Sequence, residues 1–408
     1  MGKYSIGLLG TLTGDWYNYG LGNPNAYATD EIFSVVRIQR DILSSSNVGV
    51  TYVDRAANFR GDYPKYNRAG GVDWSVYSGQ NYFIGQGVYS QNLETANPRK
   101  GGAAYLQAGH YGSLVHLDIH GTYVEPDFDI DSTGFFPKVP GKGTEQAGFY
   151  SEIHPFINKA VIRRWGLSVQ PTVVRDSDES QTGWGIKTTG WVELKDQSKL
   201  KIGFTRYQDV EVDHYYRYFR AQKLPEIVYW GRDIFAEVNT DAGKPISLAF
   251  RWNYDSQYYF QTHTTGFIRG IETTLTLKPA ANAFLEFAFQ RTLFLNQEGR
   301  KMLKDKVGQS DMRILALRAR YLFSKNVFSR AFFQHTNGAE AFIPDTLSGY
   351  LGYEVWPRMS GNFLLGWRFL PGSTLYLAYT EVWDKYKSDN FISANRVIFL
   401  KISYLWSF

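Results

Sequence analysis

Three residues on one strand-like segment carry side chains suited to metal binding or proton transfer. His116, Asp118 and His120 alternate with apolar residues between Leu114 and Gly121. In an extended strand, alternate side chains point to the same face and lie about 7 Å apart. Two imidazoles and a carboxylate at this spacing could bind a metal ion or relay a proton. Because no further ligand or nucleophile can be assigned, the pattern favours a polar strand face, and we predict no enzyme activity.

A second group of acidic residues has the spacing of a calcium ligand set. Asp127, Asp129 and Asp131 stand at alternate positions, and hard carboxylate oxygens are the ligands that Ca²⁺ prefers. An EF-hand loop requires a glutamate at its twelfth position, where this chain has Lys138. A solvated acidic loop is therefore favoured over a cation site at these three aspartates. We expect no other metal and no cofactor.

Three arginines near the C-terminus alternate with apolar residues and should lie on the same face of the sheet. Arg318 and Arg320 stand in one segment and Arg368 in another. A guanidinium stays charged at any working pH, so a cluster of them could line a pore that favours anions or sugar hydroxyls. The alternative is that carboxylates neutralise them in a polar interior: Glu272, Glu286 and Asp118. We take all of these residues, with His116 and His120, as candidates for lining a pore.

Composition restricts the kind of fold that can position these residues. The chain has 408 residues, 17% of them aromatic, and its mean hydropathy is −0.34. A helical membrane span needs about 20 consecutive apolar residues, and the sequence has no such run. It has no cysteine for disulfides or thiolate metal sites, and a net charge of only +5 gives no support to nucleic-acid binding. Strands with one apolar and one polar face remain, as in a transmembrane β-barrel.

Turn signals divide the chain into strand-length segments. Nine short turns alternate with ten longer polar connections, which predicts about 20 strands, with 18 and 22 left open. No blade repeat of a propeller is visible. We therefore predict that residues 1–408 form a single all-β domain, an antiparallel up-and-down transmembrane barrel. Its first and last strands should pair, because a bilayer does not permit an unpaired sheet edge.

The C-terminal segment is apolar at every second position up to the last residue. Leu400, Ile402, Tyr404, Trp406 and Phe408 form the apolar row. This pattern resembles the closing strand of bacterial outer-membrane β-barrels, in which the terminal aromatic residues serve as the signal to the barrel-assembly machinery. The resemblance implies an outer-membrane location, with membrane lipid and the assembly machinery as partners.

Further blocks of sequence extend this resemblance along the chain. They are Gly7–Gly14, Ser34–Ile42, Tyr66–Trp74, Gly134–Lys138, Arg320–Asn326 and Phe369–Tyr379. In this order they resemble an uncharacterised bacterial outer-membrane barrel domain that follows a carbohydrate-binding-module-like domain of the family-nine type. The resemblance implies fold and location, and a periplasmic domain of that kind as an expected partner. The connection Asn337–Ser360 departs from it by being longer than a usual hairpin loop.

The predicted size of the barrel leads to the functional hypothesis. A wall of about 20 strands encloses a lumen too wide for its own side chains to fill. A pore or transport channel for an unidentified solute is the favoured function. In the alternative, loops such as Glu125–Glu145 and Asn337–Ser360 fold inward. The barrel would then be a non-conducting surface-binding or structural protein, or a component of a larger envelope complex.

Overall fold

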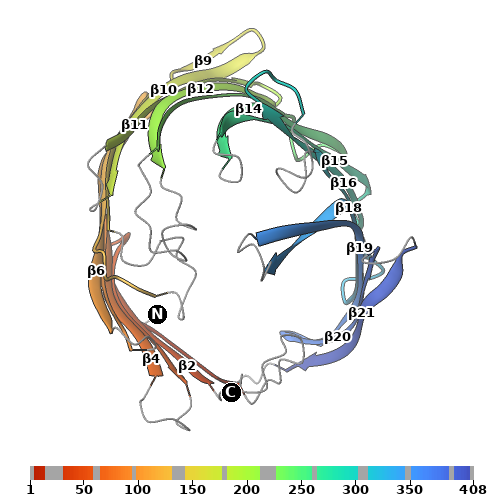
Figure 1. The fold of residues 1–408 in the computed structure, drawn as a ribbon. Helices are drawn as coiled ribbons and strands as arrows, with labels where there is room; N and C mark the ends of the chain where they lie inside the picture. Colours follow the sequence, from red (N-terminus) through yellow and green to blue (C-terminus); the bar gives the residue numbers. More distant parts are fainter. Residues whose placement is uncertain are drawn as a thin grey trace. The chain divides into compact units, whose positions relative to one another are not determined.

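The computed structural model describes eleven stretches of the chain. They are residues 4–13, 31–57, 65–93, 98–130, 143–176, 182–211, 227–259, 264–301, 311–344, 351–385 and 390–404. All regular secondary structure within these stretches is β-strand (Figure 1). None of the described residues form a helix with the length and apolar character needed to cross a lipid bilayer.

The strands are numbered in chain order. The first eleven are β1 (Tyr4–Thr13), β2 (Glu31–Ile42), β3 (Ser46–Ala57), β4 (Lys65–Ser78), β5 (Asn81–Asn92), β6 (Arg99–Tyr111), β7 (Val115–Val124), β8 (Thr144–Ile153), β9 (Phe156–Lys159), β10 (Ile162–Asp176) and β11 (Thr182–Leu194). The other ten are β12 (Lys199–Glu211), β13 (Ile227–Asn239), β14 (Ile246–Tyr259), β15 (Thr264–Ala280), β16 (Ala283–Asn296), β17 (Asp311–Leu322), β18 (Val327–Pro344), β19 (Leu351–Leu370), β20 (Ser373–Asp384) and β21 (Ile392–Ser403).

The strands form one antiparallel sheet in which sequence neighbours are also spatial neighbours. Ten residue pairs join β1 to β2, and the registers continue in the same way to the pairing of β20 with β21. The short strand β9 lies after Pro155, which has no N–H for the ladder, and it pairs with β10. The prediction of about 20 antiparallel strands is thus confirmed. A pairing of β1 with β21, which would close the sheet, stays a prediction.

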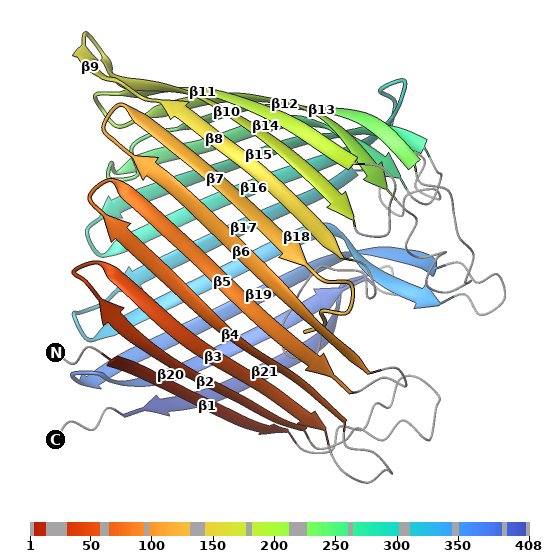
Figure 2. The same ribbon diagram turned by 90° about the vertical axis from the view of Figure 1, so that its left-hand side faces the viewer.

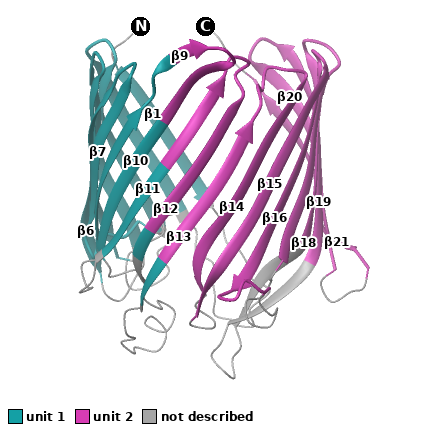
Figure 3. Cartoon of the chain, turned by 90° about the horizontal axis from the view of Figure 1, so that it is seen from above, with its two compact units in different colours: residues 1–156, 167–188, 207–230 teal, residues 157–166, 189–206, 231–408 magenta. Residues whose placement is uncertain are grey.

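The chain divides into two compact units (Figure 3). Unit 1 comprises residues 1–156, 167–188 and 207–230, and unit 2 comprises residues 157–166, 189–206 and 231–408. In unit 1 the short turns that follow β2, β4 and β6 lie together at one end of the strands (Figure 2). In unit 2 the same holds for the short turns that follow β13, β15, β17 and β19 (Figure 3). In each unit we call this the turn end and the opposite end the loop end.

The sheet of each unit has one polar and one apolar face. On β7 in unit 1, Leu117 and Ile119 are 41% and 62% exposed, whereas Asp118 on the other face is 4% exposed. In unit 2, Leu315 of β17 and Ile398 of β21 are 52% and 68% exposed. A monomer in water rarely exposes so much contiguous apolar surface. The alternation that the sequence predicted for β7, β17 and β19 is therefore the alternation of these two faces.

One predicted loop is largely strand. The segment Asn337–Ser360 was expected to be a long connection, but β18 reaches Pro344 and β19 begins at Leu351. Residues 339–344 pair with residues 351–356. The register shifts between Thr336 and Ala339. This irregularity interrupts the period of two on which a strand assignment from sequence depends.

A pair of adjacent residues on β15 can test which face meets lipid. Leu275 lies opposite Phe287 on the apolar face, and Thr274 lies opposite Ala288 on the polar face. We expect Leu275→Arg to lower the free energy of unfolding by about 2–4 kcal/mol, because it places a charge in hydrocarbon. We expect the control, Thr274→Arg, to change it by less than about 1 kcal/mol. Urea unfolding from lipid vesicles measures both, and equal losses would contradict the assignment of the faces.

An ion pair joins two short turns of unit 2. Lys244 Nζ lies 2.9 Å from Asp196 Oδ2, and Asp196 Oδ1 also accepts the backbone N–H of Ser198 at 3.0 Å. The hydrogen bond from Lys244, followed by those from Ser198, lowers the pKa of Asp196 to about 2. The same contact raises the pKa of Lys244.

The lowered pKa of Asp196 predicts a pH dependence. A depressed carboxyl pKa stabilises the folded state above the ordinary pKa of 3.8, and this contribution disappears as the pH falls toward about 2. We therefore expect Lys244→Met to be less stable than wild type at pH 6 and equally stable near pH 2. Unfolding curves over this range measure the difference, which should be small because the pair is exposed and screened. A difference that persists at pH 2 would show that the pair is not its cause.

Candidate functional site

The polar face of unit 1 carries a hydrogen-bonded network centred on Asp118 of β7. Tyr82 of β5 donates to Asp118 Oδ2 at 2.6 Å, and the side-chain amide of Gln107 on β6 donates to the same oxygen. His120 Nδ1 lies 2.8 Å from Asp118 Oδ1. Both carboxylate oxygens are thus used, and the group is 4% exposed. A buried carboxylate with this many donors is a satisfied structural group.

His116 lies in an aromatic environment on the same face. Its Nε2 is 3.0 Å from the hydroxyl of Tyr82, and its ring centroid is 5.0 Å from that of Tyr111 and 4.9 Å from that of Tyr150. Tyr150 in turn donates to Glu152 at 2.5 Å. The three residues singled out in the sequence therefore do share a face. However, in the described part of the chain no three His, Asp or Glu side chains are placed to hold a metal ion.

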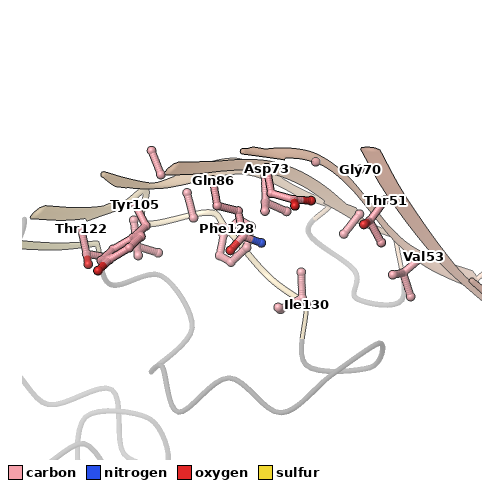
Figure 4. A pocket seen from close by; sticks show the side chains of 15 residues that line it. Thr51, Val53, Gly70, Asp73, Gln86, Tyr105, Thr122, Phe128 and Ile130 are labelled. Carbon is pink, nitrogen blue, oxygen red and sulfur yellow. The ribbon is translucent and has the colours of Figure 1, made fainter. Parts of the chain in front are cut away.

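Residues 125–130, the first part of a predicted loop, lie against the polar face of unit 1. Figure 4 shows Phe128 and Ile130 on the same side of the sheet as Asp73, Gln86 and Tyr105. Phe128 is only 5% exposed, and its backbone lies so close to Gly101 that a Cβ there would collide with it. A cavity of about 400 Å³ remains between this segment and the sheet.

The alternate aspartates of this segment do not assemble a cation site in the part of the chain that is described. Asp129 is buried and accepts a hydrogen bond from Asn92 at 3.1 Å, with Arg99 at 3.4 Å. Asp127 is exposed, and Asp131 lies outside the described residues. The burial of Asp129 between an amide and a guanidinium gives it a structural role.

A groove on the polar face of unit 2 brings together four arginines. Arg318 and Arg320 come from β17, Arg330 from β18 and Arg368 from β19, and all four are exposed. The last three lie within a few residues of the short turns, near the turn end. A cavity of about 370 Å³ in this groove is lined by Arg318, Arg320 and Arg330 together with Phe284, Phe332 and Asn362.

Each guanidinium in the groove lies over a phenyl ring. The distances from Cζ to the ring centroid are 5.5 Å for Arg318 over Phe332, 5.6 Å for Arg320 over Phe284, and 5.4 Å for both Arg330 and Arg368 over Phe328. Phe328 lies flat across Gly366, where any larger residue would collide with its ring. A cation over an aromatic face gains about 0.5–1 kcal/mol when exposed. The rings thus hold the cations in place without neutralising them.

Only one of these arginines has a carboxylate partner among the described residues. Arg318 forms an ion pair with Glu286. Arg320 and Arg330 are directly opposite each other in the sheet, where like charges are destabilising. Arg368 has no carboxylate partner in the described structure either, so three positive charges remain.

Of the three carboxylates that the sequence offers to neutralise these arginines, one does so among the described contacts. Glu286 alone pairs with an arginine of the groove. Glu272 forms no ion pair with these arginines among the described contacts, and its register partners are Arg251 and Gln290. Asp118 is committed to the network on β5, β6 and β7.

Sequence analysis missed Arg330 and the rings beneath the arginines. In β18, Phe332 and Phe333 are adjacent and therefore lie on opposite faces, so apolar residues do not mark one face. A register with β17 identifies the face, because it places Arg330 opposite Arg320. Of the predicted assembly signal, Tyr404 is 58% exposed. Trp406 and Phe408 lie outside the described residues.

No protein-family model matches the chain, and no curated protein matches it. Solved structures do resemble it. The structure of the FpvAI–pyocin S2 complex gives a TM-score of 0.60 at 9% identity over 98% of this chain and 65% of that chain. The copper transporter OprC gives 0.59 at 11% identity over 92% and 69%. The ferripyoverdine receptor of the outer membrane of Pseudomonas aeruginosa gives 0.52 at 9% identity over 87% and 62%. The chain has the fold of an outer-membrane β-barrel and spans about two thirds of these chains.

The structural role of Asp118 can be tested by removing its carboxylate. Asp118→Ala leaves the donors Tyr82, Gln107 and His120 without an acceptor, and we expect a loss of about 3 kcal/mol in the free energy of unfolding. Tyr105 donates to Gln107 at 2.8 Å at the edge of the network, so the control Tyr105→Phe should cost about 1 kcal/mol. Urea unfolding measures both. Zinc should stabilise neither protein, and zinc-dependent stabilisation of wild type alone would restore the metal-site hypothesis.

Proposed function

We propose that this chain is a bacterial outer-membrane transport barrel whose interior, lined by the polar faces, favours anionic solutes. The observation that carries the proposal is the groove with Arg320, Arg330 and Arg368. These charges are exposed, and no described carboxylate balances them. Arg320 and Arg330 lie opposite each other, where like charges cost stability, and a role in binding anions would account for their presence. During solute passage through the interior, these arginines would attract anionic solutes.

The apolar faces supply the membrane part of the proposal. They expose rows of large apolar side chains on strands of both units, as lipid contact requires. The structural neighbours include proteins named as a copper transporter, an iron transporter and an outer-membrane receptor, which supports a transport role. Because these proteins are only 8–11% identical to this chain, the support comes from the fold alone. Membrane lipid and the barrel-assembly machinery are the expected partners, the latter through the C-terminal aromatic row that includes Tyr404.

The alternative is a barrel that binds or blocks without conducting. Residues 125–130 favour it, because Phe128 and Ile130 occupy part of the polar face of unit 1. A loop in this position narrows an interior. A periplasmic binding-module-like domain, expected from the family resemblance, could complete such a block or deliver solute. In the first form the protein acts by solute passage and in the second by binding alone, in both without chemical conversion and without nucleic acid.

Single-channel recording in planar bilayers decides between passage and block. We expect a steady conductance with anion preference, read as the reversal potential under a potassium chloride gradient. Replacing Arg320, Arg330 and Arg368 by Gln should lower the anion-to-cation permeability ratio by about twofold or more, because field lines concentrate in a low-dielectric channel. Arg68→Gln is the matched control, since Arg68 lies on the apolar face at the loop end and pairs with Asp54.

The outcomes separate the hypotheses. A silent barrel with correct heat-modifiable migration on a gel would reject passage and favour the binding barrel. If the triple variant conducts with the same anion-to-cation permeability ratio as wild type, these arginines do not face the conduction path.

A further inference from the structure

A compact basic patch lies on the apolar face of unit 2, at the loop end of β15, β16 and β17. Arg291 and Arg313 are directly opposite each other, and Arg269 is in register with Leu293, which faces Asp311. Lys301, just beyond β16, completes the patch. These residues continue the same rows as Phe289 and Leu315, which are 39% and 52% exposed. The charges therefore border the apolar surface directly.

A single carboxylate pairs with three of the four cations in the patch. Asp311 lies 2.8 Å from Arg291, 2.9 Å from Arg313 and 2.8 Å from Lys301, and its side chain is 14% exposed. Arg269 is exposed and has no carboxylate partner among the described residues. Four cations against one carboxylate leave an excess of three positive charges. The carboxylate holds three of the cations together rather than neutralising the patch.

Two other arginines on the apolar face at the loop end are each paired with a carboxylate. Arg68 pairs one-to-one with Asp54 at 2.6 Å in unit 1. In unit 2, Arg396 pairs with Glu381 at 2.7 Å. In such a pair the charge of the arginine is balanced by the carboxylate, so the pair needs no bound anion. The patch on β15–β17 differs because its excess charge has no counterpart in the described protein.

The position of the patch identifies the environment that can supply a counterpart. An arginine or lysine facing lipid costs about 2–4 kcal/mol at the bilayer midplane but about 0–1 kcal/mol near the interface. A strand end that carries four cations must therefore lie at the level of the lipid headgroups. At that level the available anions are headgroup phosphates, which guanidinium groups bind by paired, charge-assisted hydrogen bonds.

We propose that Arg269, Arg291, Lys301 and Arg313 form a binding site for the phosphate groups of a membrane lipid. The phosphates contact the cations, and the acyl chains of the same lipid lie along the apolar rows that include Phe289 and Leu315. The combination of excess positive charge and bordering exposed apolar surface selects a phosphorylated lipid over free phosphate. The site is independent of solute transport, because it lies on the face opposite the arginine groove.

Lipid binding to the detergent-purified barrel tests this site. Native mass spectrometry with diphosphoryl lipid A as the probe should show saturable binding to wild type. A variant with Arg269, Arg291 and Arg313 replaced by Gln should bind it at least about tenfold more weakly. The reason is that each basic residue near a charged lipid surface contributes to the free energy of binding. Arg68→Gln is the matched control, with the same substitution on the same face and at the same end, and should bind like wild type.

A single substitution and two other ligands test the same site. If the triple variant fails to fold, Lys301→Gln alone should still weaken binding, because Lys301 lies outside the long strands. A galactolipid without phosphate should bind wild type and the variant equally and weakly. Equal binding of lipid A by wild type and the triple variant, or of inorganic phosphate as tightly as lipid A, would overturn the proposal. None of these results depends on whether the barrel conducts.

Discussion

Backbone pairing in a medium without water is the constraint on which this structure depends. Each N–H and C=O in a bilayer must find a protein partner, so strands can cross only as members of a continuous ladder. The described registers run from β1 to β21 in that way. A continuous sheet then has two faces, and the period of two assigns each side chain to one of them. The lipid face becomes apolar in its middle, and chemistry is confined to the polar face and the strand ends.

This division explains where the charges are and how they are held. On the polar face the arginines of the groove are supported by phenyl rings, which accept a cation without removing its charge. One of those rings, Phe328, requires Gly366 beneath it, so the site depends on a residue with no side chain of its own. On the apolar face the ion pairs of Arg68 and Arg396 lie toward the loop end, where contact with water or headgroups makes their cost small.

The two polar clusters differ in how far they are satisfied. Asp118 receives donors at both oxygens, and the aromatic rings around His116 leave the network complete within the protein. A saturated network rigidifies a surface but has little capacity left for a ligand. The groove has the opposite character, because Arg320 faces Arg330 with no described carboxylate between them. Unsaturated charge at an exposed position is what a binding surface provides, so the proposed function rests on the groove and the network has a structural role.

The sequence by itself determined the β-class, the approximate strand number and the facing of strands such as β7, β17 and β19, because alternation is a local property of neighbouring residues. It could not determine partners across strands, since Glu286 and Arg318 are 32 residues apart and only register joins them. For the same reason it missed Arg330, whose strand carries phenylalanines on both faces, and the strand segments after the register shift at Thr336. Tertiary structure also decided that Asp129 is buried against Arg99 while Asp127 is exposed. Contacts of this kind depend on which strands meet, and the spacing of residues along one strand does not contain that information.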